Sequence, residues 1–508
     1  MRYLFLLLIG SVIGLSTLWG QQVQNVEADL QWGDRQKAPS NTELAKIIDA
    51  GTWGAYLFRY RRGRSLSAEK YFIETYNREM DMVARFEFEL PGGDGTDLED
   101  IISLRGQLYL LLSQPDATGE ISRLLMRPFS PRGQVIGQDI PLADIPSDEK
   151  YRRRQFDLEF NRDSSYFLIY NQLPGEREGP ERFSLRVFDD AMQLQWQRDV
   201  ELPFADEGFS VRSYQIDPEG NVYLLGRHQP GKDDLGTKPV HFVYAYTRNG
   251  QQQTQYELDI ADAQLNQMLL RIAGNGDIVC AGFYGIMGQR TNLGICHMRF
   301  NPMTQEASRV DLLPFTDEFL SESTDEASRK QVSASQYYQL RDLTLRSDEG
   351  IVLVAEQYFR SNSAVNMQYG VGTNAIFHYN DIMVANIAPD GTYTWLRRIP
   401  KQQMTANDNG RHSSFAQATV QDRFLFLYND HPDNFRTDRR RRGSFEEQNE
   451  VLAITEIRRS GEMATQPLFF NKDAGIITRP RRCIQISARQ MLIYGEEERS
   501  YRLGLLSF

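Results

Sequence analysis

Two carboxylic acids near the middle of the chain could perform acid–base chemistry. Glu356 and Tyr358 end one apolar stretch, while Tyr379, Asn380 and Asp381 begin the next one. If these stretches pair as an antiparallel hairpin, their ends lie side by side at the base of the intervening loop. Two carboxylates so placed can act as general acid and base or hold a cation. They can equally accept hydrogen bonds from loop amides, and the sequence leaves both roles open.

A basic run and two histidines provide further candidates for binding. Arg440 and Arg441 are the centre of the run Arg439–Arg442, which could bind an acidic glycan, a lipid headgroup or a protein. Exposed charges contribute little individually, so a solvated loop is the other interpretation. His412 and His431 could approach each other, but the six histidines show no metal-ligand spacing. We therefore expect no metal and no cofactor.

The elements that must position these residues recur along the chain. A polar turn followed by an apolar strand appears eight times, at intervals of about 54 to 76 residues. The eight copies lie at 49–62, 104–113, 162–171, 217–227, 274–285, 347–359, 421–430 and 487–498. The turns between third and fourth strands, such as Asn249-Gly250 and Asp390-Gly391, supply the positive φ angles that a two-residue hairpin requires. Eight four-stranded units that bury their faces by stacking radially form a β-propeller. We expect an all-β fold with a single propeller of about eight blades, seven being the alternative.

The last unit lacks a fourth strand, and the N-terminal region offers one. The chain ends at Phe508, one strand short of a complete unit. The stretch "DLQWGD" at 29–34 matches the outer strand "LQWQRD" at 194–199 over Leu-Gln-Trp. We expect this stretch to pair with the last unit, close the ring and protect an edge that would invite aggregation. The alternative is a disordered N-terminal segment.

The first twenty residues have the pattern of a secretory signal peptide. Arg2 precedes an apolar run of about fifteen residues, and Gly20 precedes a polar stretch. We expect 1–20 to be removed on export and 21–508 to form the propeller domain. No later apolar stretch approaches the length of a membrane span.

Composition narrows the class of partner. The chain has 508 residues with a formal net charge of −11, which argues against nucleic-acid binding. With 24 Tyr and 28 Phe, the sequence favours sheet. Three cysteines are too few for a disulfide scaffold. Cys280 and Cys296 fall on consecutive expected strands, where buried free thiols are favoured over a disulfide.

Long insertions gather on one face of the expected propeller. This face carries the loops between second and third strands and the loops between blades, where rigid scaffolds often place function. Four of the five insertions belong to blades six and seven or to their borders. The insertions lie at 228–239, 315–335, 360–379, 401–412 and 431–449.

Three stretches resemble a known group of proteins. These are "VAEQYF" at 354–359, "HYNDIMVANIAPDGTYTWLRRIPKQQ" at 378–403 and "WGDRQKAP" at 32–39. They resemble uncharacterised exported β-propeller-like proteins of Bacteroidota, and the resemblance covers most of the mature chain. It implies a propeller in the periplasm or at the outer membrane, with an extracellular location also open. No catalytic residues carry over from it.

Binding is favoured over catalysis by these observations. The sequence contains no phosphate-binding loop, dinucleotide fingerprint or GxSxG motif. We expect an exported, monomeric, non-catalytic scaffold that binds an envelope protein or other envelope component through the loops of blades six and seven. The alternative is a carbohydrate-active enzyme or a lectin-like glycan binder that uses the same face.

Overall fold

The computed structural model describes residues 26–51, 54–61, 70–90, 95–146, 156–173, 179–205, 208–229, 238–321, 335, 337–367, 370–435, 443–445 and 450–508. The expected signal peptide at 1–20 lies outside these described residues, as do Arg440 and Arg441. Among the described helices, none is long and apolar enough to cross a membrane.

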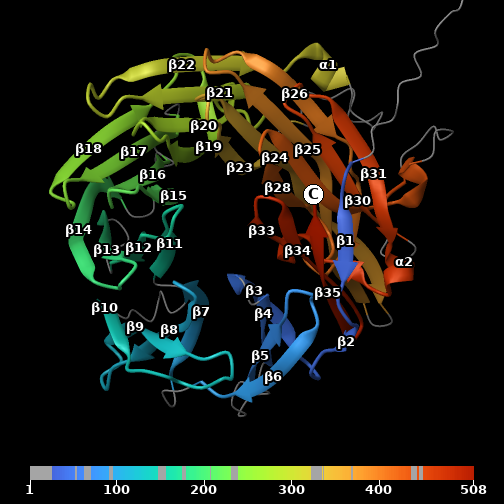
Figure 1. Ribbon diagram of the computed structural model, residues 1–508. Helices are drawn as coiled ribbons and strands as arrows, with labels where there is room; N and C mark the ends of the chain where they lie inside the picture. Colours follow the sequence, from blue (N-terminus) through green and yellow to red (C-terminus); the bar gives the residue numbers. More distant parts are fainter. Residues whose placement is uncertain are drawn as a thin grey trace, which may run out of the picture.

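The described chain forms eight antiparallel sheets arranged around a central axis (Figure 1). In the first seven, the strands follow one another in sequence and the first strand lies innermost. The strands of the first four blades are β3 (Glu43–Asp49), β4 (Ala55–Arg61), β5 (Lys70–Tyr76) and β6 (Met82–Phe88); β7 (Asp97–Leu104), β8 (Gln107–Pro115), β9 (Ile121–Phe129) and β10 (Ile140–Pro146); β11 (Phe156–Phe160), β12 (Tyr166–Gln172), β13 (Pro180–Asp189) and β14 (Leu194–Ala205); and β15 (Phe209–Ile216), β16 (Val222–His228), β17 (Val240–Thr247) and β18 (Gln252–Leu258).

The other four blades carry the additional short elements of the fold. Blade five is followed by helix α1 (Asp317–Ser321), and blade six has a fifth strand, β27. The elements are β19 (Gln264–Ile272), β20 (Ile278–Gly285), β21 (Asn292–Phe300) and β22 (Ala307–Pro314); β23 (Tyr338–Leu345), β24 (Ile351–Met367), β25 (Gly370–Ile387), β26 (Tyr393–Ile399) and β27 (Gln403–Ala406); β28 (Ala416–Val420), β29 (Arg423–Asp430), η4 (Pro432–Phe435), β30 (Val451–Ile457), β31 (Met463–Phe470) and α2 (Asn471–Ala474); and β32 (Ile477–Thr478), η5 (Pro480–Arg482), β33 (Ile484–Ser487), β34 (Gln490–Glu497) and β35 (Ser500–Ser507). The prediction of an all-β propeller with eight blades is confirmed.

Burial explains why second strands read as continuous apolar runs. All eight residues of β20 are buried, because the strand lies between two neighbouring blades. The outer strand β22 instead alternates between exposed and partly buried residues. An apolar cluster joins each pair of neighbouring blades in the described chain. One of them joins Leu44 and Leu57 of the first blade to Tyr494 and Leu503 of the eighth.

The two hairpin turns that the sequence analysis singled out have different backbone conformations. At Asn249-Gly250 both residues have positive φ, +55° and +72°, as expected. At Asp390-Gly391 only the glycine does, with φ +81°, so the expectation for Asp390 is wrong. The Asp390 side chain instead accepts a hydrogen bond from the amide of Thr392, which closes the turn locally.

The N-terminal strand pairs with the last blade, as the sequence predicts. Strand β1 (Asp29–Trp32) runs antiparallel to β35, with Asp29 opposite Ser507 and Trp32 opposite Gly504. A second short strand, β2 (Gln36–Lys37), pairs with the start of β35. The Trp32 ring packs edge-on against Phe469 of blade seven at 5.4 Å. The first residues described therefore complete the blade that ends the chain.

Deleting residues 26–32 is expected to destabilise the protein and to promote aggregation. The deletion removes four ladder pairs and the Trp32 ring, for a loss of about 2–4 kcal/mol, and it exposes the edge of β35. Differential scanning fluorimetry with light scattering measures both effects. The single change Trp32→Ala keeps the backbone ladder and should lower Tm less. Equal Tm for the deletion and the parent protein would contradict this role.

The two cysteines of blade five are buried free thiols. Cys280 lies opposite Met298 and Cys296 lies opposite Gly282, so the two cysteines are not cross-strand partners. Burial raises the pKa of the Cys296 thiol to about 12, which keeps it protonated and unreactive at neutral pH. The favoured interpretation of the sequence is confirmed.

Candidate functional site

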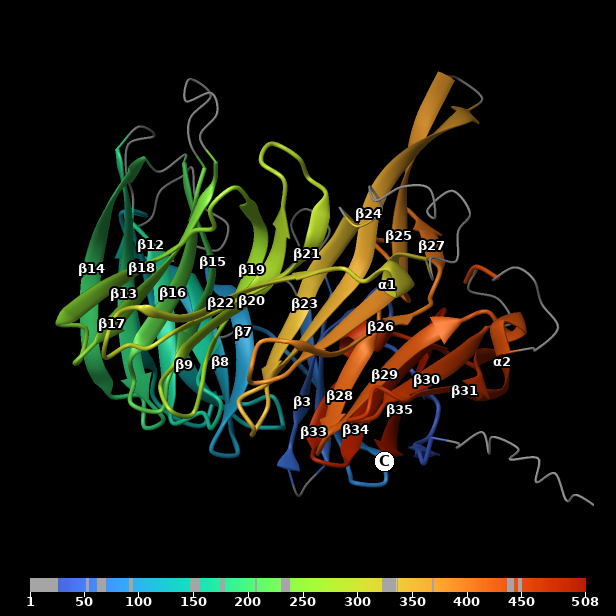
Figure 2. The same cartoon turned by 90° about the horizontal axis from the view of Figure 1, so that it is seen from above.

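The hairpin of blade six extends far beyond its sheet. Strands β24 and β25 have 17 and 18 residues, and Figure 2 shows them rising above the strands of the other blades. Residues 351–356 are buried, whereas residues 360–364 are all exposed. The pairing between the strands shifts its register between Glu356 and Tyr358. We call the projecting part, residues 358–367 and 370–379, the arm.

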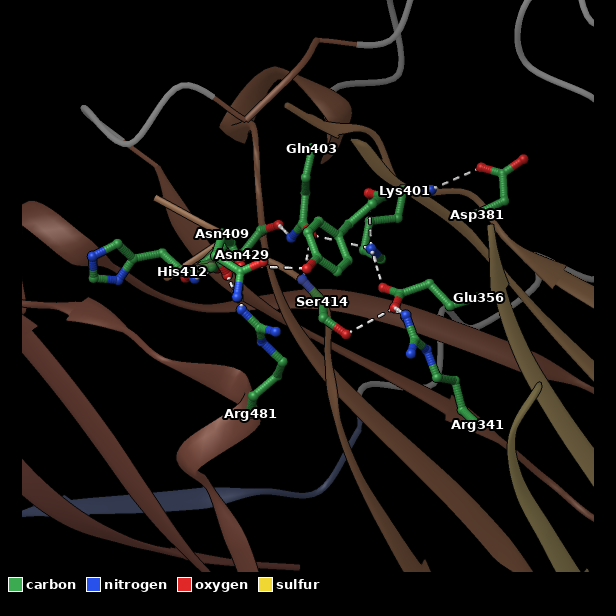
Figure 3. A network of polar contacts seen from close by, with 12 residues as sticks. Arg341, Glu356, Asp381, Lys401, Gln403, Asn409, His412, Ser414, Asn429 and Arg481 are labelled. Atoms are coloured by element: carbon green, nitrogen blue, oxygen red, sulfur yellow. Dashed lines mark hydrogen bonds and ion pairs between the residues drawn. The ribbon is translucent and has the colours of Figure 1, made fainter. Parts of the chain in front are cut away.

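Glu356 lies at the base of the arm and is completely buried. Its Oε1 accepts a hydrogen bond from Nζ of Lys401 at 2.8 Å. Its Oε2 accepts from Nη2 of Arg341 at 2.8 Å and from Oγ of Ser414 at 2.9 Å (Figure 3). Both oxygens are thus used within the protein.

Lys401 follows the outer strand β26 and is also completely buried. Besides Glu356, its Nζ donates to the carbonyl oxygen of Tyr379 at 2.9 Å and to Oε1 of Gln403 at 3.1 Å. All three donors of the ammonium group are therefore satisfied. Burial lowers the pKa of Lys401, and the neighbouring Glu356 carboxylate opposes that shift.

Asp381 makes a second buried ion pair on β25, with 4% of its surface exposed. Its Oδ2 accepts from Nη1 of Arg398 at 3.0 Å, and its Oδ1 accepts from the backbone amide of Lys401 at 3.1 Å. The Arg398 guanidinium lies 4.4 Å from the ring centroid of Phe319 in α1. Asp381 therefore fixes the chain where it leaves β26.

The contacts of Glu356 and Asp381 bear on their two possible roles, which are acid–base chemistry or cation binding on one side and hydrogen bonding to the loop on the other. A general acid or base must lie within hydrogen-bonding reach of a substrate proton. The oxygens of Glu356 and Asp381 instead bind side chains and a backbone amide of the protein itself. Buried charges are retained at low cost only when they are paired in this way. The arrangement is that of a structural anchor for the loop at 401–414.

The two tyrosines pack against each other and against arginines. The rings of Tyr358 and Tyr379 are 4.8 Å apart. Arg341 lies over Tyr358 at 5.8 Å and Arg481 over Tyr379 at 5.4 Å, distances typical of cation–π contacts. Tyr379 is 3% exposed and donates from its hydroxyl to the carbonyl of Asn409 at 3.4 Å. Its ring is thus unavailable for stacking on a sugar.

The remaining candidates each have their own surroundings. Asn380 is partly buried on β25. His412 is buried, which lowers its pKa to about 4, and its carbonyl accepts from Asn429 at 2.8 Å. His431 is half-buried, and its Nδ1 accepts from the amide of Asp433 at 3.2 Å. No group of metal-ligating side chains occurs among the residues that the structure describes.

The loops of blades six and seven join into one surface beside the arm. Strand β27 pairs with the arm, with Gln403 opposite Tyr379. The fully buried Phe445 of the blade-seven loop forms a parallel bridge with Gln403 and donates its amide to the carbonyl of Gln402 at 3.0 Å. In the same loop, Asn434 bonds both the amide and the carbonyl of Gly443. We call this combined feature the joined surface.

Sequence reasoning missed the residues that hold the joined surface in place. Lys401 lies 45 residues from Glu356 in the chain, and Ser414 lies 58 residues from it. No local motif links these positions. The only sequence signal is a lysine directly after Pro400, in an insertion already singled out.

A cavity of about 520 Å³ lies next to the buried network. Its lining includes two arginines, Arg341 and Arg481, one acid, Asp342, and the polar residues Ser414, Gln417 and Gln485. Two larger cavities, of about 880 and 1170 Å³, are lined by turns between first and second strands, at the other end of the blades. Acids accompany the arginines there, so neither cavity selects one sign of charge.

Comparison with known proteins gives structural matches of low similarity. No protein-family model matches the sequence, and a comparison with curated proteins gives no match. Similar solved structures include prolyl oligopeptidase B from Galerina marginata, with a TM-score of 0.39 and 9% identity over 85% of this chain and 52% of that chain. The β-propeller domain of the trilobed protease from Pyrococcus furiosus has a TM-score of 0.37 and 11% identity over 85% and 97%. An ulvan lyase has a TM-score of 0.35 and 12% identity over 80% and 90%. The chain spans about half the length of the prolyl oligopeptidase, and no activity transfers at this level of similarity.

Proposed function

We propose that the protein is an exported, non-catalytic propeller scaffold that binds a protein or another component of the cell envelope. The binding face is the joined surface, which comprises the β27 side of the arm and the blade-seven loop. Export is inferred from the apolar stretch at 1–20. The role as a scaffold is supported by the fold and by the internal hydrogen bonds that occupy the carboxylates of Glu356 and Asp381.

The bridge between Gln403 and Phe445 is the observation that carries the proposal. It links the described parts of loops from two blades, and Gln403 is itself held by Lys401. Loops that are fixed before binding lose less conformational entropy when a partner docks. A surface that is both projecting and fixed is suited to recognition of a large partner.

An acidic glycan is the second candidate ligand. Its support is the cavity beside the network, whose lining includes Arg341, Arg481, Gln417 and Gln485 together with one acid, Asp342. Guanidinium groups recognise carboxylates and sulfates through paired hydrogen bonds, and amide side chains recognise sugar hydroxyls. If this alternative holds, the glycan binds in the cavity and not at the joined surface.

Affinity capture from an envelope extract tests the proposal. The full-length protein is compared with a variant in which the blade-seven loop, 431–449, is shortened. We expect a partner that the parent protein retains and the variant loses. The captured protein is then purified, and its Kd for both forms is measured by titration calorimetry, with at least about a tenfold loss expected for the variant.

A loop on the same face but on another blade provides the matched control. Shortening 228–239 on blade four should leave the Kd unchanged. If both shortened proteins bind equally well, the joined surface is not the binding face. If Arg481→Ala abolishes binding of an acidic oligosaccharide and no protein is captured, the glycan alternative replaces the proposal.

A further inference from the structure

One edge of the arm has no strand partner among the described residues. Strand β23 pairs with β24 from Ile351 to Gln357 and no further. From Tyr358 to Met367, the only described strand that pairs with β24 is β25. The other edge of this ten-residue segment therefore presents backbone N–H and C=O groups that no described strand binds.

The middle of the segment is accessible from both faces. Residues 360–364 are exposed at every position, whereas a strand packed on one face would alternate between buried and exposed. Figure 2 shows the arm standing clear of the rest of the ring. A second strand could therefore approach this edge without meeting the blades.

The edge lacks a feature that protects four of the outer edges of this protein. The outer strands β10, β14, β22 and β31 each contain proline, at Pro141 and Pro146, Pro203, Pro314 and Pro467. Between Tyr358 and Tyr379 the sequence has no Pro, Lys, Asp or Glu, and Arg360 is its only permanent charge. Proteins usually protect exposed edges with such residues, so an unprotected one indicates a pairing site.

We propose that two copies of the chain associate by antiparallel pairing of their β24 edges at residues 358–367. The sequence alone favoured a monomer, because the free edge depends on where β23 begins. An antiparallel pair of identical strands is self-complementary about a two-fold axis, so each copy satisfies the edge of the other. The β27 side of the arm and the blade-seven loop stay free, so the proposal is independent of the proposed function.

The residues at the centre of the edge suit self-pairing. A two-fold axis at Ser361, Asn362 or Ser363 places Arg360 opposite Asn362, Ala364 or Asn366, respectively. The single charge then never faces its own copy, and the neighbouring side chains are small and uncharged. Like charges directly opposite would destabilise the pair.

The net charge of each copy opposes association, but the two charged rings lie far apart in the proposed dimer. Each chain carries a formal charge of −11. Ten extended residues span about 30 Å, while the Debye length in physiological salt is about 8 Å. The arms therefore keep the two rings apart by several Debye lengths, so their repulsion is largely screened in physiological salt. Association should weaken only when the salt falls to about 0.01 M, where the Debye length is about 30 Å.

Sedimentation velocity of the full chain over a range of concentrations tests the proposal. We expect a reversible monomer–dimer equilibrium that shifts to monomer only when the salt falls to about 0.01 M. The double variant S361K/S363K places charges on the edge and should weaken the association at least about tenfold. The control is Val310→Lys, at an equally exposed position of the outer strand β22, and it should leave the equilibrium unchanged.

Cysteine cross-linking locates the axis. In an antiparallel pair of identical strands, only the residue on the two-fold axis lies opposite its own copy. The single variants Ser361→Cys, Asn362→Cys, Ser363→Cys and Ala364→Cys are therefore oxidised separately, and the yields of disulfide-linked dimer are compared. We expect a disulfide-linked dimer at one of these positions and little at its neighbours. The native Cys280 and Cys296 are fully buried and should not react, and the partly buried Cys483 is replaced by Ser in every variant.

Three results would overturn the proposal. They are a monomer at every concentration, a dimer that S361K/S363K leaves intact, and a cross-link yield that is equal at all four positions. Circular dichroism melting of each variant distinguishes loss of association from loss of folding. Partner capture through the blade-seven loop can succeed or fail independently of these outcomes.

Discussion

Replacing Lys401 with methionine is expected to lower the free energy of unfolding by about 3–5 kcal/mol, because it removes one partner of a buried ion pair. Glu356 would remain completely buried and lose the charge that faces its Oε1. The carbonyl of Tyr379 and the amide oxygen of Gln403 would also lose a donor. Such groups are costly to leave without partners away from water.

Urea denaturation of the parent protein and of Lys401→Met measures this loss. Lys46 provides the matched control, because its ion pair with Asp100 has the same 2.8 Å distance but both side chains are about 40% exposed. Lys46→Met should cost less than about 1 kcal/mol. If the two substitutions cost the same, Lys401 does not anchor the loop. Adding Glu356→Gln to Lys401→Met should recover part of the loss, because no completely buried charge then remains and Arg341, which loses its partner, has a side chain 32% exposed to water.

Acidification is expected to destabilise the protein through two buried histidines. Burial lowers the pKa of His412 to about 4 and, together with Arg227 and Arg212, lowers that of His241 to about 3. Above pH 6.5 both rings are neutral in the folded and the unfolded chain. As the pH falls, the unfolded chain gains protons first, so stability falls until the folded pKa is passed. His412 alone should account for about 3 kcal/mol.

Urea denaturation at pH 7.5 and 4.5 compares the parent protein with His241→Gln/His412→Gln. The double variant should lose less stability on acidification, since neither glutamine takes up a proton. His431→Gln changes a half-buried histidine and serves as the control. An equal loss in all three proteins would assign the acid sensitivity to other groups.

Local patterns determined the architecture. Turn residues and apolar runs recur eight times because each blade repeats the same local conformation, so no long-range contact had to be known to count the blades. The partner of the last blade could also be predicted, because residues 29–34 repeat the Leu-Gln-Trp of the outer strand at 194–199. The same alternation located the hairpin that holds Glu356 and Asp381, but the expectation of a loop at 360–379 is wrong, because β24 and β25 continue as paired strands to Met367 and from Gly370.

The chemistry of the site was decided only by the tertiary structure. Glu356 is an anchor rather than a free acid because Lys401, Arg341 and Ser414 reach it from other strands and loops. Burial and pairing depend on contacts between residues far apart in the chain, and a local pattern carries no information about them. The free edge of the arm also depends on contacts between distant segments. Strand β23 begins at Tyr338, opposite Gln357, while β24 continues to Met367 without it.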